Sequence, residues 1–206
     1  TQGGDSTDSG VNKEIYDANG IWLCARLREM GCEILQYETA GDDRDKIADK
    51  ISEVLKEADL ILTTGGVSVG DKDLVPDVIE SLNGRVLFHG IRVKPGMPTM
   101  LSVVEDIPVL SLSGNPFAVA ALFELLAGGY LADRAEEVYT QKKETFVKTG
   151  KPKRIVKGKC DEEGVFLPQI QRNGQLKNGI GSNCLVVFPE GERTYPEGEK
   201  VQVIRI

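Results

Sequence analysis

Residues 60–73, with the sequence LILTTGGVSVGDKD, decide the fold prediction for this chain of 206 residues. The apolar, β-type run from Leu60 to Thr64 ends in a glycine-rich loop, and a segment with helical periodicity follows Asp73. Glycine lets a backbone approach a ligand closely, and the N–H groups at the start of a helix carry partial positive charge. A strand, a glycine loop and a helix in this order therefore predict an anion-binding loop.

Two acidic residues, Asp71 and Asp73, lie at the end of this loop. Carboxylates beside an anion are unfavourable unless they share a cation, so the pair indicates a Mg²⁺-bridged phosphate or a related oxyanion. Asp73 has an alternative role as the cap of the following helix, and the sequence leaves both roles open. Asp42 and Asp43 precede another predicted helix and could be a second pair of metal-water ligands, although capping explains at least one of them.

Composition restricts the classes of partner. The net charge of −7 disfavours non-specific nucleic-acid binding, which needs a basic face. We find neither an apolar run of the roughly 20 residues that span a bilayer nor a secretory signal, so we expect a cytoplasmic protein that does not enter a membrane. The four cysteines show no CxxC spacing, which favours reduced thiols over a zinc site. Because His89 is the only histidine, histidine-rich metal chemistry is excluded.

The order of the predicted elements indicates an α/β fold. Helices are expected from Asp17 to Gly31, after Asp43, over 74–82 and from Pro116, with strands at 32–37, 59–64, 85–93, 99–104 and 107–113. The last two strands could form a hairpin across Glu105-Asp106 or lie apart in one sheet. Strands that alternate with helices predict a three-layer, mostly parallel sheet covered on both faces, which we assign to residues 1–142.

The pattern changes near residue 140. Residues 140–154 are polar and basic and are predicted to be a linker. Helical periodicity then stops, and short apolar runs alternate with turn sequences such as Glu-Glu-Gly and Pro-Glu-Gly. Residues 143–206 are therefore predicted to form a small, all-β, barrel-like or sandwich-like domain.

Three loops are expected to meet at the carboxyl edge of the predicted sheet, namely 65–73, 94–98 (KPGMP) and 113–116 (SGNP). Gly65, Gly66 and Gly70 permit positive φ, and the Ser68 hydroxyl can donate to an oxyanion. Lys94 can meet a phosphate as a point charge on a loop that prolines stiffen, although a solvated surface lysine is its default role. Asn115 can bond its own loop or a ligand, with the turn role favoured.

The letters GVSVG at 66–70 also spell the G-x-S-x-G nucleophile elbow of α/β-hydrolases. That alternative makes Ser68 the nucleophile, with Asp77 and His89 as its partners. The spacing argues against it, because one helix and one strand separate Ser68 from His89, and His89 lies inside a predicted strand.

The loops, in this order and spacing, resemble the molybdopterin molybdotransferase family (MoeA and the E domain of gephyrin). The matching pieces are IYDAN (15–19), the Asp pair at 42–43, TTGGVSVGDKD (63–73), KPGMP (94–98), GNP (114–116) and EGEKVQV (197–203). The resemblance covers nearly the whole chain, but only the C-terminal half of a full-length member, whose two further domains include an elongated one involved in dimerisation. It implies a molybdopterin-binding α/β domain followed by a short β domain.

The resemblance implies an enzyme of molybdenum-cofactor assembly. Its substrates would be adenylylated molybdopterin and molybdate, and Mg²⁺-dependent insertion of molybdate would release AMP, with a homodimer as a further expectation. The motif matches place Asp73, Asp42 and Lys94 in catalytic roles, the two aspartates also at the metal. They place these residues at the substrate: Gly65, Gly66, Ser68, Gly70, Asp71, Pro95, Gly96, Ser113, Gly114, Asn115 and Pro116.

Two alternatives within this reading stay open. Met97 stands where the family commonly has lysine, and Ala118 replaces a family serine whose hydroxyl would face the oxyanion. Together with a missing N-terminal acid, these departures favour a non-catalytic molybdopterin-binding module. A molybdopterin adenylyltransferase shares the α/β fold, but that domain usually stands alone, so the β domain argues against it.

Overall fold

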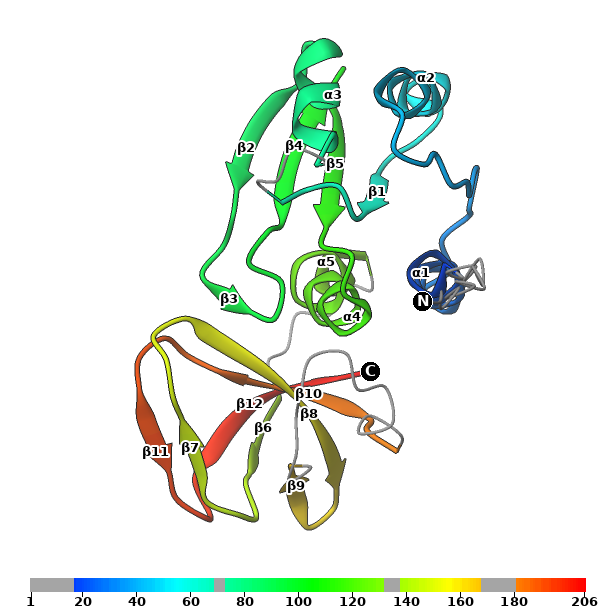
Figure 1. The fold of residues 1–206 in the computed structure, drawn as a ribbon. Helices are drawn as coiled ribbons and strands as arrows, with labels where there is room; N and C mark the ends of the chain where they lie inside the picture. The colour runs from blue at the N-terminus through cyan, green and yellow to red at the C-terminus, as the bar shows by residue number, and fades with distance from the viewer. Residues whose placement is uncertain (1–16, 69–72, 132–137, 168–180) are drawn as a thin grey trace, which may run out of the picture.

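The computed structural model describes residues 17–68, 73–131, 138–167 and 181–206. It contains a four-stranded sheet and a six-stranded sheet, and helix α4 (Pro116–Phe123) lies between them (Figure 1). Helices and strands both contribute to the first part of the chain, and the α/β class is confirmed there.

The first two helices begin where their caps were predicted. Asp17 accepts a hydrogen bond from Gly20 N–H at the start of α1 (Ala18–Glu29), and Gly31 follows that helix with φ of +80°. Asp43 caps α2 (Arg44–Val54) through Lys46 N–H. The strand predicted at 32–37 is wrong, because this stretch pairs with no strand among the described residues.

The first sheet has the strand order β1-β5-β4-β2, from β1 (Ile61–Thr64), β5 (Ile107–Leu112), β4 (Met100–Val104) and β2 (Arg85–His89). Only β1 and β5 run parallel among these described strands, so the prediction of a mostly parallel sheet is wrong for them. The cause is the β4–β5 hairpin, which turns at Glu105 and Asp106 with φ of 49° and 70°. The hairpin alternative is therefore confirmed.

Alternate residues of the central strands enter two different cores. Val109 and Met100 join Ile51 of α2 and Val78 of α3 (Val75–Ser81) on one face of the sheet. Leu110 and Leu112 join residues of α1 and α4 on the other face. This period-two alternation is what a strand buried on both faces requires. Burying both faces holds the carboxyl ends of β1 and β5 close to the start of α4.

Helix α4 continues through a π-helical segment, η1 (Glu124–Gly128), into α5 (Gly129–Leu131). Five of the eight residues of α4 are buried, as its apolar sequence predicts. Glu124 is a buried acid at the start of η1, and its Oε1 accepts a hydrogen bond from Arg26 Nε of α1 at 2.5 Å. This ion pair ties α1 to the central helix.

The second sheet has the strand order β3-β8-β10-β12-β6, with β9 added on β8. Its strands are β3 (Val93–Lys94), β6 (Val138–Gln141), β8 (Lys153–Asp161), β9 (Gly164–Phe166), β10 (Cys184–Phe188) and β12 (Lys200–Arg205). A separate pair joins β7 (Phe146–Lys148) to β11 (Arg193–Tyr195). The described strands do not close into a barrel, so a barrel-like form is not confirmed. The predicted linker, 140–154, instead contains β7 and parts of β6 and β8.

The two sheets pack on a common core, and the segment between β2 and β4 supplies a strand of the second sheet. Ile155, Leu185 and Ile204 of the second sheet pack in the same cluster as α4. The other face of that sheet forms its own core, with Phe188 stacked on Phe146. Strand β3, which lies in sequence between β2 and β4 of the first sheet, pairs in parallel with β8 of the second sheet. The division at residues 142/143 remains a prediction. Within the part of the chain that is described, no helix has the length and apolarity needed to cross a bilayer.

Candidate functional site

Two of the three predicted loops meet directly at the carboxyl ends of β1 and β5. Gly65 N–H donates to Leu112 O at 2.9 Å, and the Cβ position of Gly114 lies 3.7 Å from Gly65 Cα. Gly65 and Gly66 have φ of 81° and 61°, which glycine adopts without strain. A Cβ built on Gly65 has no neighbour within 4 Å among the described residues, so these leave open space at this point of the backbone.

Polar side chains without partners gather at the same place. Ser111 Oγ and Ser113 Oγ are buried and make no hydrogen bond to any described group, and the same holds for Thr63 Oγ1. Thr63 and Ser111 are paired in the β1–β5 register, so they lie side by side. Buried hydroxyls normally have a partner, because leaving one unsatisfied costs about 1–3 kcal/mol. These hydroxyls therefore leave hydrogen-bonding capacity without a described partner at the ends of β1 and β5.

The SGNP loop is fixed by its own hydrogen bonds. Asn115 Oδ1 accepts from Ala118 N–H at 3.1 Å and so caps α4, and Pro116 occupies the first helical turn. The turn-forming role of Asn115 is thus the one observed. Asn19 Nδ2 of α1 donates to Gly114 O at 3.0 Å, while its Oδ1 has no described partner. These contacts hold Gly114 beside Gly65.

The KPGMP loop packs on α4. Pro95 is buried, the Lys94–Pro95 peptide is cis, and a Cβ on Gly96 would overlap the Leu122 side chain of α4. Gly96 also has φ of 103°, so only glycine fits this position well. Lys94 is exposed on β3, and Met97 is 43% exposed. The loop is seated on α4, with its lysine at the surface.

Ser68 and His89 do not form the pair that a hydrolase needs. His89 Nε2 lies 2.8 Å from Val67 O, which assigns the ring nitrogen as a donor to that carbonyl. Val67 itself is buried in the core beside α3. His89 therefore fixes the backbone of the glycine loop, and the structure gives no support to the nucleophile-elbow alternative.

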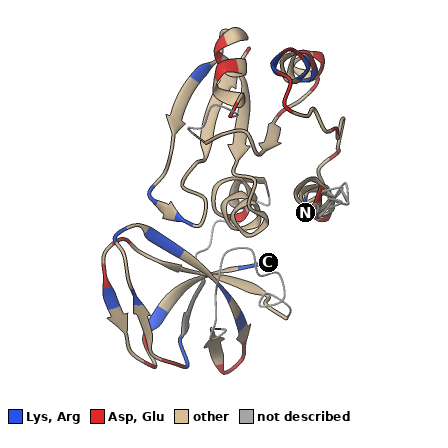
Figure 2. Cartoon of the chain, in the orientation of Figure 1, with Lys and Arg blue, Asp and Glu red and all other residues tan. Residues whose placement is uncertain are grey.

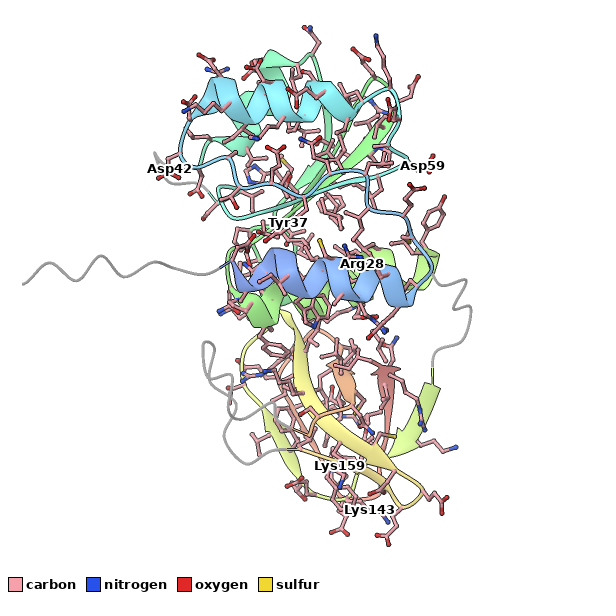
Figure 3. All side chains as sticks on the ribbon, turned by 90° about the vertical axis from the view of Figure 1, so that its right-hand side faces the viewer. Arg28, Tyr37, Asp42, Asp59, Lys143 and Lys159 are labelled. Carbon is pink, nitrogen blue, oxygen red and sulfur yellow. The ribbon has the colours of Figure 1, made fainter. Side chains whose placement is uncertain are left out.

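The predicted acids Asp42 and Asp73 lie before two different helices. Asp42 is exposed just before α2 (Figure 3), and the neighbouring cap role belongs to Asp43. Asp73 is half-buried, and the cap position of α3 is Leu74, which makes no side-chain cap bond. Gly70 and Asp71 lie outside the described residues. The described part of the chain contains no group of three or more metal-ligating side chains.

Two residues near this site were not anticipated from the sequence. Asn19 lies within the matched stretch IYDAN, but nothing in its spacing indicates a contact with Gly114, which is 95 residues away. Lys157 of β8 places its Nζ 4.7 Å from the ring centroid of Phe117, the residue after Pro116. No local pattern marks either contact, since both depend on how distant elements pack.

Comparison with known proteins points to one family. The family model described as "Probable molybdopterin binding domain" matches residues 5–133. A putative molybdopterin biosynthesis protein of Methanocaldococcus jannaschii is 30% identical over 95% of this chain and 48% of its own length. Molybdopterin molybdenumtransferases of Staphylococcus aureus and Bacillus subtilis are 29% and 30% identical, over 97% and 94% of this chain. The chain spans about half the length of these relatives.

Solved structures agree with this grouping. The MoeA molybdopterin biosynthesis protein of Pyrococcus horikoshii superposes with a TM-score of 0.77 at 28% identity, over 93% of this chain and 48% of that one. A molybdenum cofactor biosynthesis protein of Pyrococcus furiosus gives a TM-score of 0.70 at 25% identity, over 92% of this chain. The similarity therefore includes the second sheet as well as the first.

Proposed function

This chain belongs to the molybdopterin-binding domain family, with MoeA-type relatives over most of its length, and from that premise we propose that it binds adenylylated molybdopterin and takes part in molybdate insertion. One observation carries the proposal. The open space at Gly65 adjoins Gly114, and the preceding residue, Ser113, has a buried hydroxyl with no partner among the described residues. A phosphate-bearing ligand supplies the acceptors that this place lacks.

We assign the following roles in ligand binding to individual residues. Backbone N–H groups of the glycine loop and the Ser113 hydroxyl would bind an oxyanion of the ligand, with Gly65 and Gly66 leaving room for it. Asn115 keeps the SGNP loop and the start of α4 in place through its cap bond. Lys94 would attract the anionic ligand from the surface of the KPGMP loop. Ser68 is proposed as a further hydroxyl donor.

Mg²⁺ is proposed to accompany the substrate. Mg²⁺ commonly keeps several waters and binds through one or two carboxylates plus substrate phosphates. Asp73 and Asp42 are the candidate carboxylates. In this proposal the Mg²⁺ ion arrives with the substrate and does not stay bound to the protein alone. The Mg²⁺ ion would supply positive charge that neutralises the phosphates when AMP is released.

The extent of the match favours transfer over adenylylation. The relatives named molybdopterin molybdenumtransferase align with nearly all of this chain, including the second sheet. The non-catalytic binding module keeps the support of Met97 and Ala118, which stand where the family commonly has lysine and serine. The transferase and the non-catalytic binding module differ only in whether the bound substrate is turned over.

A single-turnover experiment with adenylylated molybdopterin, Mg²⁺ and molybdate separates these functions. AMP release that requires molybdate supports insertion. Tight binding without AMP release supports the module, and ATP consumption with free molybdopterin supports adenylylation. Absence of any binding overturns the proposed function. Sedimentation of the same sample tests the homodimer that we also propose.

A further inference from the structure

One side-chain hydrogen bond joins the start of α1 to the SGNP loop. Asn19 Nδ2 donates to Gly114 O at 3.0 Å, although the two residues are 95 positions apart in the sequence. A carbonyl oxygen can only accept, so this contact also fixes which way the Asn19 amide faces. Gly114 in turn lies against Gly65, since its Cβ position is 3.7 Å from Gly65 Cα. Asn19 therefore links α1 to the two glycines that border the open space.

Asn19 is itself held in place by its neighbours. Asp17 accepts from Gly20 N–H through Oδ1 and from the Tyr37 hydroxyl through Oδ2, both at 3.0 Å. The Tyr37 ring lies so close to α1 that a Cβ on Gly20 would overlap it, so this approach requires glycine (Figure 3). These contacts fix the first turn of α1 on both sides of Asn19 and leave its amide little freedom to move.

Stability alone does not explain an asparagine at this position. The side chain gains the hydrogen bond to Gly114, but its Oδ1 is buried and has no partner among the described residues. An unsatisfied buried acceptor costs as much as one neutral hydrogen bond contributes, or more. The net contribution of the Asn19 side chain to stability should therefore be near zero or unfavourable. Such departures from good local structure are expected at functional sites.

The loop that Asn19 holds contains no charged side chain. Residues 113–116 include no Lys, Arg, Asp or Glu, and Figure 2 shows the link between β5 and α4 free of both colours. Within this loop an anion can meet only uncharged donors, such as backbone N–H groups and the Ser113 hydroxyl. Hydrogen bonds from these donors weaken steeply when distance or angle departs from the ideal. A small displacement of Gly114 would therefore weaken binding.

We propose that Asn19 is a positioning residue of the candidate site, whose hydrogen bond to Gly114 keeps the SGNP loop in the conformation that binds the ligand. The identity of that ligand, a phosphate-bearing pterin, rests on the proposed function. Asn19 acts through Gly114 and does not contact the ligand. The competing role is structural, in which this bond only secures α1 to the rest of the fold.

The variants Asn19→Leu and Asn19→Asp test the proposal, with Ala18→Asp as the matched control. Leucine keeps the approximate shape of the side chain and removes the donor. Aspartate replaces the donor with a second acceptor and adds a negative charge. Ala18 is exposed one residue earlier in the same turn of α1, so Ala18→Asp adds this charge and leaves the bond to Gly114 intact. Molybdopterin and inorganic pyrophosphate are the two probes, titrated calorimetrically at low and high salt, and urea unfolding measures stability.

Both Asn19 variants are expected to bind each probe about tenfold more weakly, which is near the upper limit of what one neutral hydrogen bond contributes. The urea midpoint of Asn19→Leu should match that of the parent protein. Ala18→Asp should lose less than about twofold in affinity at high salt, because the added charge is then screened.

Unchanged affinity of Asn19→Leu for both probes, with or without a lower urea midpoint, overturns the inference and leaves the proposed function intact. A loss confined to Asn19→Asp and equalled by Ala18→Asp is charge repulsion and also overturns it. If Asn19→Leu weakens pyrophosphate binding but the parent protein does not bind molybdopterin, the proposed function fails and the positioning role stands. Binding of neither probe by the parent protein overturns both.

Discussion

Gly65 is the residue on which the candidate site depends most. It combines positive φ with open space beyond its Cα, and Gly31 shares both properties at the end of α1. We expect Gly65→Ala and Gly31→Ala to lose similar stability, about 1–2 kcal/mol each, because an L-residue is strained at positive φ. Only Gly65→Ala should weaken ligand binding, since its methyl group would occupy the open space.

Urea unfolding and calorimetric titration of both variants measure the two effects separately. Equal binding by Gly65→Ala and Gly31→Ala would remove the Gly65 loop from the site.

The cysteines give a second prediction at this scale. Burial raises the pKa of Cys184 to about 12, and Cys160 is also buried, whereas Cys24 and Cys32 are half-exposed. Because the thiolate is the reactive form, Cys184 should be almost inert at pH 8, with a thiolate fraction on the order of 10⁻⁴. A disulfide-exchange reagent should therefore modify Cys24 and Cys32 quickly in the folded protein, and Cys160 and Cys184 only on unfolding. Peptide mapping identifies the modified thiols, and rapid native labelling of Cys184 would contradict the structure.

Sequence reasoning succeeded for residues whose role is local. Asp17, Asp43 and Asn115 cap the helices that follow them, because a cap acts within three residues. It could not anticipate Lys157 or Asn19, whose contacts join separate elements. The sequence also did not distinguish Ser113 from the other residues of its loop. The burial of its hydroxyl without a described partner depends on tertiary packing.

Among the elements, α1 and η1 are joined by a buried ion pair. The Glu124 side chain is fully buried, and Arg26 approaches it from α1 while also pairing with Glu29. Arg26→Met should destabilise the protein by about 3–5 kcal/mol, because it leaves a buried carboxylate without its cation. Arg28→Met on the same helix is the control, since Arg28 is exposed, and it should change stability by less than about 0.5 kcal/mol.

Chemical denaturation followed by circular dichroism compares the two arginine variants. Equal midpoints for Arg26→Met and Arg28→Met would mean that the pair does not hold α1 on the central helix.

At the scale of elements, strong periodicity predicted well and short apolar runs did not. The helices α1, α2 and α4 were found where their sequences and caps indicated, and α3 was found where its apolar stripe indicated, without a side-chain cap. Residues 32–37 have the composition of a strand, yet they have no pairing partner in the described sheet, and Leu35 and Tyr37 are about half-exposed. A strand needs a neighbour, which composition alone does not supply.

For the whole molecule, the shared core predicts coupled unfolding. Trp22 is the only tryptophan, and it packs edge-on against Phe123 with ring centroids 5.9 Å apart, so its fluorescence reports on α1 and α4. Ile155→Ala in the second sheet should lower stability by about 2–5 kcal/mol, because it leaves a cavity in the same cluster. The Trp22 fluorescence midpoint should fall with it, although the substitution lies in β8.

Val156→Ala is the comparison, since Val156 faces the separate core of the second sheet. If Ile155→Ala left the midpoint of the Trp22 fluorescence transition unchanged, the two sheets would unfold independently.

The pairing of β6 with β12 has a practical consequence for anyone who divides this protein into pieces. A fragment that begins at residue 143 would lack β6, the strand that pairs with Lys200–Val203 of β12. Strand β12 would then be an unpaired edge strand of the second sheet. Such edges recruit one another, so the fragment would tend to self-associate in solution. A fragment that begins before Val138 would include β6, which keeps β12 paired, and it should not self-associate in this way.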